Sequence, residues 1–521
     1  MSKFSGALAA ACLLAFGALA ATAAERLSPV VQTHDGAVQG LIKDGTRQYL
    51  GIPFAAPPVG DLRWKPPAPP APWTGVRKAT QFGGSCPQGH DIGDFAKPSD
   101  TEDCLYLNVY APAKASGKPR AVMLWFPGGA LFAGAADDYD GAKLARQGDI
   151  ILVTMNYRIG VLGFFDHPAI DSEGHAKGNY AILDQQASLK WVRDNIAKFG
   201  GDPKRVTIAG QSAGGTSVIA HLLSPASKPL FARAINESGA RMTLPTLAEA
   251  TKTGVRFATD AGCPETSSPQ SAACLRALSV QQIVKIQPGH FAGLILDGDI
   301  IPAQPSVALK SGQFAHVPIL NGVAGDEQGF FLAIAEETAG PLTPAGYRDY
   351  LARTFGAAHA DEVLKLYPID AYPSINQAEI AASQMYRGCL GRQLNRWFAD
   401  YTPTWAFQFE DRTTPSYLKP KAWSLGAYHT VELVYLFPGF HGGLGTAHKL
   451  NAAQEKLADQ IVGAWTTFIR TGKPNPSGLS PWPRYVAARD NVQGFNIPRS
   501  TNRDGYGARY NCAVWDRIAP Y

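Results

Sequence analysis

RVTIAGQSAGG, residues 205–215, decides the fold, because it reads as a short buried strand, a turn of small residues and the start of a helix. Residues 210–214 fit the pattern GxSxG around Ser212. The glycines let the backbone bend so sharply that the serine hydroxyl stands clear of its neighbours and is free to attack. Because serine between glycines also occurs in ordinary loops, this prediction depends on the rest of the chain.

Further strands are predicted by two continuous apolar runs, AVMLWF (121–126) and DIILVTMNY (149–157). Such runs suit strands that helices cover on both faces, as in a parallel sheet. Between residues 180 and 199 apolar side chains recur at helical spacing, and the sequence GGDP ends that helix before the next strand delivers Ser212. This order predicts an α/β fold with a wound sheet, whose ligands gather at the carboxyl ends of the strands.

The other segments predict strands, one long helix and irregular backbone. Residues 51–67 are rich in proline and glycine and are expected to be irregular, whereas residues 101–112 alternate as a strand does. The remaining expected elements are strands at 317–323 and 404–410 and a last clear helix at 451–470. No linker divides the chain, so we expect one catalytic domain, residues 24–521, with long excursions between the later strands.

Composition is that of a globular protein: of the 521 residues, 17% are charged and 45% are hydrophobic. The formal net charge of +5 is small for this length, and no block of lysine and arginine is present. We therefore expect no nucleic-acid partner, because the mild basicity is most simply that of a solvated surface.

The first 23 residues have the pattern of a secretory signal peptide. Lys3 supplies a positive charge, residues 7–20 are apolar, and residues 21–23 are small enough for cleavage. A membrane anchor would need a longer apolar stretch, and no later run of about 18 apolar residues occurs. We expect removal of residues 1–23, no stable membrane insertion, and a mature protein that is periplasmic or secreted.

Cysteine usage agrees with export. One of the seven cysteines, Cys12, lies in the predicted signal peptide, and six remain. An even number in an exported protein favours disulfides over metal ligands, although six cysteines allow 15 connectivities. Cys86 with Cys104 and Cys263 with Cys274 would each close a short loop, and Cys389 with Cys512 would tie down the C-terminus.

A serine hydroxyl becomes a good nucleophile when a base lies within hydrogen-bond reach and an acid orients that base. Asp326 and Glu327 follow the strand expected at 317–323, and His429 follows the strand expected at 404–410. The order serine, acid, histidine is that of α/β-hydrolases. Position after a sheet strand favours His429 among the 11 histidines. Either carboxylate could be the acid, but both cannot face one imidazole.

The transition state of acyl transfer carries a negatively charged oxygen that backbone N–H groups can stabilise. Ala213 directly follows the predicted nucleophile and would provide one donor. The sequence PGGA, residues 127–130, would provide the others, since glycines let the backbone approach the substrate closely. In isolation, a glycine pair after a strand can also be only a turn.

Eight motifs together resemble the type-B carboxylesterase and cholinesterase family along nearly the whole mature chain. They are GIPFAAPPVGDLRW (51–64), EDCLYLNVY (102–110), NYRIG (156–160), GNYAILDQ (178–185), FGGDP (199–203), GQSAGG (210–215), DGDIIP (297–302) and DEQGFF (326–331). The resemblance implies an α/β-hydrolase fold. Such a fold has a large, mostly parallel, twisted central sheet flanked by helices, with long inserted loops and helices over the active site.

The resemblance also implies roles for single residues and the three cysteine pairs named above. The residues concerned are Ser212 as nucleophile, Glu327 as acid and His429 as base, Gly129, Ala130 and Ala213 in the oxyanion hole, and Glu432, Ser217 and Ser238 as supporting polar residues.

Three departures from the family pattern bear on specificity. The family usually has HGGG where this chain has PGGA, so we expect the hole to persist with less space beside the methyl group of Ala130. Gln211 replaces a common glutamate, and residues 86–104 contain no tryptophan to hold a quaternary ammonium. We therefore expect a carboxylesterase and not a cholinesterase. Candidate pocket residues are Phe132, Gln211, Phe330 and Phe331.

The sequence thus predicts an exported serine esterase that hydrolyses a small-molecule carboxylic ester with water and needs no cofactor or metal. A narrower alternative is an esterase for an unusual substrate, such as an acidic ester, a polyester, a lactone, a toxin or a carbamate. The same scaffold also occurs in non-catalytic binding proteins that have lost the triad. Here all three triad positions are occupied, which favours the enzyme.

Overall fold

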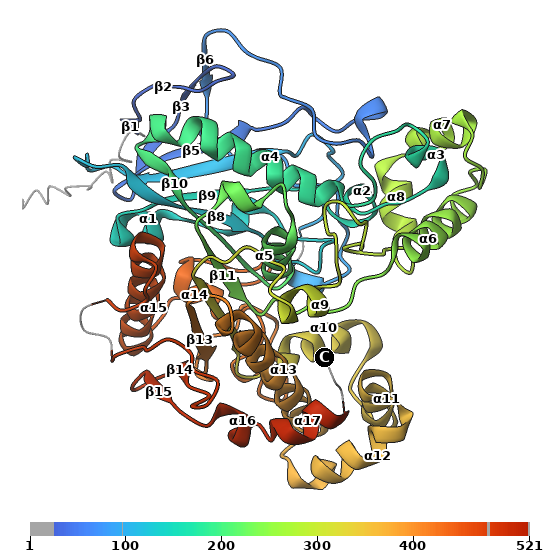
Figure 1. The fold of residues 1–521 in the computed structure, drawn as a ribbon, viewed down its shortest axis with the longest axis vertical. Helices are drawn as coiled ribbons and strands as arrows, with labels where there is room; N and C mark the ends of the chain where they lie inside the picture. Colours follow the sequence, from blue (N-terminus) through green and yellow to red (C-terminus); the bar gives the residue numbers. More distant parts are fainter. Residues whose placement is uncertain (1–25, 96, 477–479, 519–521) are drawn as a thin grey trace, which may run out of the picture.

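The computed structural model describes residues 26–95, 97–476 and 480–518 (Figure 1). The predicted signal peptide, residues 1–23, and its cleavage site lie outside the described residues.

Twelve strands of the described residues form one central sheet. From β9 to β14 in spatial order neighbouring strands are parallel, whereas the strands at both edges pair antiparallel. In spatial order the strands are β1 (Arg26–Leu27), β4 (Leu41–Lys43), β5 (Thr46–Pro53), β7 (Tyr106–Pro112), β9 (Ile151–Met155), β8 (Arg120–Phe126), β10 (Gly201–Gln211), β11 (Arg233–Glu237), β12 (Ile319–Ala324), β13 (Thr404–Phe409), β14 (Val492–Phe495) and β15 (Thr501–Arg503). A separate small sheet contains β2 (Val31–Gln32), β3 (Ala37–Gln39) and β6 (Val76–Lys78).

Helices fill the connections between these strands. They are α1 (Ala142–Gly148), α2 (Gly160–Gly163), α3 (Pro168–Asp171), α4 (Tyr180–Asn195), α5 (Ala213–Leu223), α6 (Leu247–Asp260), α7 (Pro269–Ala277), α8 (Val280–Ile286), α9 (Pro305–Lys310), α10 (Gln328–Ala339), α11 (Pro344–Phe355), α12 (Ala357–Leu366), α13 (Ile375–Ala399), α14 (Leu433–Leu436), α15 (Ala452–Thr471), α16 (Tyr506–Arg509) and α17 (Cys512–Ile518). Short 3-10 helices are η1 (Gly60–Leu62), η2 (Gly93–Phe95), η3 (Ala136–Asp138), η4 (Ile196–Phe199), η5 (Lys228–Leu230) and η6 (Ile369–Ala371).

The strand β8 shows why the central strands read as continuous apolar runs. Alternate side chains pack on opposite faces of the sheet: Val122, Leu124 and Phe126 belong to one core cluster, and Met123 and Trp125 belong to another. The first cluster includes residues of α4, α5, α9 and α13, and the second includes residues of α1, α14 and α15 (Figure 1). Helices therefore bury both faces, as a parallel sheet requires.

Two groups of helices form the long excursions between the later strands. The helices α6, α7 and α8 pack with α2 and α3 around a small core, and α11, α12 and α17 pack with α13 around another. Figure 1 shows the two groups one above the other on the right of the view. This sheet with its flanking helices and insertions is the α/β-hydrolase fold that the resemblance implies.

Three disulfide bonds are present in the described residues, and they join the pairs that the resemblance implies. The pairs are Cys86–Cys104, Cys263–Cys274 and Cys389–Cys512. The third bond links α13 to α17 across 123 residues of sequence. None of the described helices combines the length and the apolar character that a membrane span needs.

Most elements expected from the sequence are present. The strands expected at 121–126, 149–157, 317–323 and 404–410 correspond to β8, β9, β12 and β13. The helix expected at 180–199 is α4 followed by η4, and the helix expected at 451–470 is α15.

Three expectations are wrong in part. Residues 51–53 are not irregular but end β5, because they still pair with β7. Residues 101–105 are not strand, and β7 begins only at Tyr106; the segment before it carries the ion pair of Glu102 with Arg63 and the disulfide of Cys104. Two short helices, α16 and α17, follow α15, which is therefore not the last helix.

Candidate active site

Ser212 occupies a sharp turn between β10 and α5, with a φ of 60° and a ψ of −119°. A left-handed φ is rare for a residue with a side chain and matches the strained turn that exposes a nucleophile. The flanking glycines permit this turn: a Cβ on Gly210 would lie 2.5 Å from Gly214, and a Cβ on Gly214 would lie 2.0 Å from the carbonyl oxygen of Phe126. The Ser212 N–H donates to the carbonyl oxygen of Glu237 at 2.8 Å, which holds the turn against β11.

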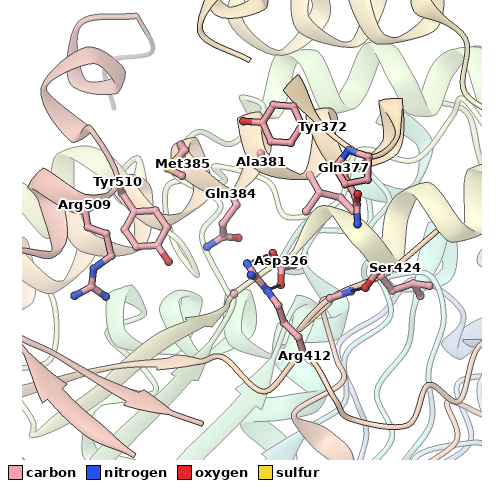
Figure 2. A pocket seen from close by; sticks show the side chains of 15 residues that line it. Asp326, Tyr372, Gln377, Ala381, Gln384, Met385, Arg412, Ser424, Arg509 and Tyr510 are labelled. Atoms are coloured by element: carbon pink, nitrogen blue, oxygen red, sulfur yellow. Dashed lines mark hydrogen bonds and ion pairs between the residues drawn. The ribbon is translucent and has the colours of Figure 1, made fainter. Parts of the chain in front are cut away.

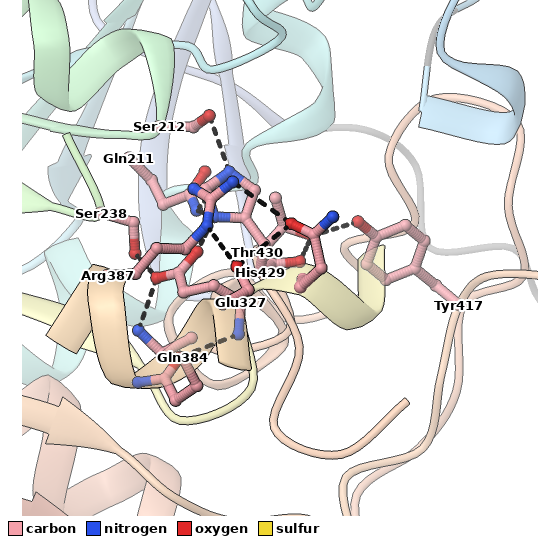
Figure 3. A network of polar contacts seen from close by, with 12 residues as sticks. Gln211, Ser212, Ser238, Glu327, Gln384, Arg387, Tyr417, His429 and Thr430 are labelled. Atoms are coloured by element: carbon pink, nitrogen blue, oxygen red, sulfur yellow. Dashed lines mark hydrogen bonds and ion pairs between the residues drawn. The ribbon is translucent and has the colours of Figure 1, made fainter. Parts of the chain in front are cut away.

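Three side chains from the carboxyl ends of three strands form a continuous chain of hydrogen bonds (Figure 3). Ser212 follows β10, Glu327 follows β12, and His429 lies after β13. A carboxylate only accepts, so the Nδ1–H of His429 donates to Glu327 Oε2. The Nε2 of His429 is then free to accept the hydroxyl proton of Ser212, whose Oγ lies 2.7 Å away.

The two adjacent carboxylates have different partners. Glu327 Oε1 accepts hydrogen bonds from Ser238 Oγ at 2.6 Å and from the backbone N–H of Ala324 at 2.8 Å. Asp326 does not contact His429; it accepts hydrogen bonds from Arg412 Nε at 2.7 Å and Nη2 at 2.8 Å. It also accepts from the N–H of Ala427 at 2.8 Å, so Asp326 ties the acid-bearing loop to the histidine-bearing loop.

Burial and charge act in opposite directions on the carboxyl groups of the site. Burial alone would raise the pKa of Glu327, but the charge and hydrogen bond of His429 and the charge of Arg387 hold that pKa below its ordinary value. Burial raises the pKa of Glu432 well above its ordinary range and the pKa of Glu237 to about 8. At neutral pH the negative charge beside the imidazole therefore resides on Glu327.

Gln211 does not line a pocket, and the expectation that it does is wrong. Its side chain is fully buried, with 0% of its surface exposed, because it lies behind the imidazole of His429. Its Nε2 is 3.4 Å from each ring nitrogen of His429. An uncharged amide thus lies against the imidazole, where the related family often has a carboxylate.

The loop after β8 carries the residues expected in the oxyanion hole. Its backbone is left-handed at Gly129 (φ 117°) and at Ala130 (φ 55°). Tyr139 OH accepts a hydrogen bond from Gly128 N–H at 3.2 Å, and Tyr157 OH donates to the carbonyl oxygen of Pro127 at 2.8 Å. These two tyrosines hold the start of the loop in place. In the described residues, no hydrogen bond is donated by the N–H of Gly129 or Ala130.

The third expected donor, the N–H of Ala213, is at the first position of α5. The first N–H groups of a helix have no partner within the helix and carry partial positive charge. Gln185 and Ala213 fix Ser217, which donates to the Ala213 carbonyl at 3.0 Å and accepts from Gln185 at 3.0 Å. Ser217 therefore supports this helix end and does not contact the triad directly.

The three phenylalanines expected in the pocket differ in exposure. Phe331 is 36% exposed, and its ring centre lies 5.1 Å from that of His429. Phe330 is only 4% exposed and packs edge-on against Phe95 in the core. Phe132 is half-buried and contacts the ring of Phe291 at 5.8 Å. Phe331 therefore presents surface beside His429 and Phe132 presents surface on the loop after β8, whereas Phe330 is mainly a core residue.

Sequence reasoning missed one charged residue of the site, Arg387 on α13. Its guanidinium lies over the ring of Phe331 at 5.0 Å from the ring centre. The available signal was that Arg387 is the only charged residue between Glu379 and Arg392 in the sequence.

A pocket of about 410 Å³ lies beside the acid-bearing loop, against α13 (Figure 2). Asp326 and Gln384 line it, but Ser212 and His429 do not. Gln384 accepts a hydrogen bond from the N–H of Glu327 at 3.3 Å, so this pocket adjoins the acid from behind. In the part of the chain that the structure describes, no group of three or more His, Cys, Asp or Glu side chains could hold a metal ion.

Comparison with known proteins identifies the family to which this chain belongs. The model of the "Carboxylesterase family" matches residues 27–515. A para-nitrobenzyl esterase of Bacillus subtilis (strain 168) is 36% identical over 475 residues, which cover 88% of this chain and 92% of that protein. An acylcarnitine hydrolase of Mus musculus is 35% identical over 490 residues, with coverage of 88% and 85%. A fumonisin B1 esterase of Sphingopyxis macrogoltabida is 35% identical over 512 residues, with coverage of 93% and 90%.

Comparison with solved structures also finds an esterase. A PNB esterase structure superposes with a TM-score of 0.80 at 31% identity, covering 94% of this chain and 99% of the other.

Proposed function

This chain belongs to the carboxylesterase family and hydrolyses carboxylic esters, and we propose that it does so through an acyl-enzyme on Ser212. The observation that carries the proposal is the unbroken chain of hydrogen bonds from Ser212 through His429 to Glu327. The Oγ to Nε2 distance of 2.7 Å lies within the range for direct proton transfer.

In the first half of the reaction, Ser212 Oγ attacks the ester carbonyl carbon while His429 Nε2 takes the hydroxyl proton. The C=O bond becomes a single bond to a negatively charged oxygen. When that intermediate collapses, the bond to the alcohol oxygen breaks and His429 gives its proton to the leaving alcohol. The acid part of the ester remains bound to Ser212.

In the second half, water replaces the alcohol. His429 takes a proton from the water as its oxygen attacks the acyl carbon, and the bond to Ser212 Oγ then breaks. The proton returns from His429 to Ser212, and the carboxylic acid leaves. The ester and one water molecule are thus converted into an acid and an alcohol.

Glu327 acts on this sequence through His429. By accepting the Nδ1–H it keeps Nε2 unprotonated before each attack, and its negative charge stabilises the imidazolium that forms. Ser238 orients Glu327 by donating to its other oxygen.

The oxyanion hole is formed by the N–H groups of Gly129, Ala130 and Ala213. Two observations support this: the left-handed loop after β8 leaves the first two without described partners, and the third begins a helix. Each donor of this kind contributes roughly a hundredfold or more to the rate.

The proposal extends to processing and compartment. Residues 1–23 are a signal peptide, and residues 24–521 act as one catalytic domain in the periplasm or outside the cell. The three disulfide bonds support this, because disulfides persist in oxidising compartments, and the lack of an apolar spanning helix in the described residues is compatible with it.

Hydrolysis of p-nitrophenyl esters from acetate to long acyl chains tests the proposal, with Ser212→Ala measured beside the wild type. We expect turnover by the wild type and a loss of several orders of magnitude in the variant, with the chain-length optimum reporting the acyl pocket. Undiminished hydrolysis by the variant would refute the assigned nucleophile. Inactivity of both proteins on every ester would favour a non-catalytic binding protein.

A further inference from the structure

One arginine beside the proposed triad, Arg387, forms no direct ion pair among the described residues, although its charge acts on Glu327 at longer range. Arg387 projects from α13 toward the side of His429 (Figure 3), with its guanidinium over the ring of Phe331. That ring packs against the imidazole, with 5.1 Å between the ring centres, and is 36% exposed. A positive charge therefore lies one aromatic ring away from the proposed general base.

Within the described residues Arg387 uses only part of its hydrogen-bonding capacity. Its Nε donates to Ser383 Oγ at 3.2 Å, and one Nη donates to Gln328 Oε1 at 3.3 Å. A guanidinium has five N–H donors in a planar fork. The described contacts use two of them, so the fork keeps donors for a planar anion such as a carboxylate.

The nearby carboxylates are occupied or held apart. No ion pair among the described residues involves Arg387, and the Glu327 carboxylate is bonded to His429. Glu379 is separated from Arg387 by Gln328, whose Nε2 donates to Glu379 at 2.9 Å. Arg387 therefore acts on Glu327 only at longer range, where its charge lowers the pKa of that carboxyl group, and no carboxylate of the described residues contacts its guanidinium directly.

Other buried and half-buried arginines differ in this respect: Arg233 also lacks an ion pair among the described residues, whereas others have one. Each of three examples forms an ion pair with a carboxylate: Arg63 with Glu102, Arg158 with Asp184 and Arg392 with Asp490. Removing a cation from water without a counter-charge is costly. A counter-charge in direct contact with Arg387 is what a negatively charged substrate would supply.

A second arginine near the same end of the sheet also lacks an ion pair among the described residues. Arg241 follows β11 three residues after Ser238, and its Nη1 lies 2.5 Å from where a Cβ on Gly293 would be. Gly293 is two residues from Phe291, whose ring contacts Phe132 beside the expected oxyanion loop. Arg241 thus adds positive potential near the site, which attracts anionic substrates.

We propose that Arg387 binds a carboxylate of the substrate, so that the preferred esters carry a free carboxyl group a few bonds from the ester. This inference rests on the proposed function of Ser212, because it names the substrate class of that site. The guanidinium pairs with the carboxylate while the ester carbonyl lies at Ser212, and Arg241 assists at longer range.

The experiment compares acidic and neutral esters of equal length. Monoethyl succinate, monoethyl glutarate and monoethyl adipate are paired with ethyl butanoate, ethyl pentanoate and ethyl hexanoate, and acid release is followed by pH-stat. The proteins are the wild type, Arg387→Gln, Arg387→Lys and Ser212→Ala. Arg348→Gln is the matched control, because Arg348 is exposed, pairs with Asp361 and loses the same charge.

We expect the wild type to prefer at least one acidic ester over its neutral partner. Arg387→Gln should lower kcat/KM for that ester by roughly 10- to 100-fold, mainly through KM, because one charged hydrogen-bonded pair is lost. Its rate on the neutral ester should fall by a clearly smaller factor, so that the ratio of acidic to neutral kcat/KM drops by about tenfold or more, and circular dichroism verifies that the variant is folded. Arg387→Lys should keep part of the preference, and Arg348→Gln should keep all of it.

The outcomes separate the two proposals. Equal rates of the wild type on acidic and neutral esters would overturn the carboxylate site while leaving the esterase proposal intact. An equal fall on both ester classes in Arg387→Gln would also overturn it, since Arg387 would then be a positioning residue for Glu327. Hydrolysis that persists in Ser212→Ala would instead refute the proposed function.

Discussion

Replacement of Glu327 by glutamine is predicted to inactivate the enzyme by fixing the wrong tautomer of His429. In the native site Glu327 Oε1 accepts from the Ala324 N–H at 2.8 Å and from Ser238 Oγ at 2.6 Å. A backbone N–H can only donate, so the amide oxygen of the introduced glutamine must take that position. The amide NH₂ group must then face His429 Nδ1.

The consequence for the imidazole follows from hydrogen-bond polarity. A ring nitrogen that faces an NH₂ group accepts, so the ring proton moves to Nε2, where it faces Ser212. A protonated Nε2 cannot take the serine proton. The equivalent change in Ser-His-Asp enzymes lowers kcat by about 10⁴-fold, or about 5 kcal/mol of transition-state stabilisation, and we expect a similar loss here.

The neighbouring carboxylate provides a matched control for this substitution. Asp326→Asn removes the same charge one residue away, but Asp326 contacts Arg412 and Ala427 and not the imidazole. Because the Arg412 side chain is 70% exposed, loss of this ion pair should change kcat by less than about tenfold. The assay is kcat on p-nitrophenyl acetate, with circular dichroism to verify folding. The reasoning is refuted if Glu327→Gln keeps more than a tenth of the activity, or if Asp326→Asn loses as much.

Two further predictions concern the oxyanion loop and a buried acid. Gly129→Ala should lower kcat about a hundredfold or more, because the new Cβ would lie 2.1 Å from the Ala133 carbonyl oxygen and displace the loop. Circular dichroism should show that the fold is retained. An unchanged kcat would exclude Gly129 from the oxyanion hole. Burial raises the pKa of Glu237 to about 8, so this carboxyl group holds its proton in the folded state at pH values where the unfolded state has lost it. The wild type should therefore lose stability as pH rises from about 5 to about 8. Glu237→Gln removes this titration and should gain in Tm relative to the wild type across that range, whereas parallel Tm curves would contradict the shifted pKa.

The sheet and the order of the site residues could be predicted because short stretches of sequence indicate the strands and the turn at the nucleophile. Strands buried on both faces are apolar at nearly every position, as in residues 121–126 of β8, and GxSxG is a local requirement of the turn at Ser212. His429 could be found because it follows a recognisable strand. The family resemblance then chose Glu327 over Asp326, a choice that the residues alone left open.

The rest depends on contacts between segments far apart in the chain. Asp326 is turned from the imidazole by Arg412, which lies 86 residues later, and no local pattern reports that pair. Gln211 lies inside the GxSxG motif, directly before the nucleophile, a position that predicts a pocket residue, but the packing of His429 over it leaves no exposed surface. Arg387 reaches the site only because α13 packs against α10, a contact that its sequence does not announce.

The central claim, a covalent intermediate on Ser212, is tested most directly by labelling with diethyl p-nitrophenyl phosphate. The wild type is treated with increasing amounts of the reagent, its intact mass is measured, and the labelled peptide is sequenced. We predict one diethylphosphoryl group per chain, located on Ser212, with esterase activity falling in proportion to labelling. A label on another residue, or full activity in protein labelled at Ser212, would contradict the account.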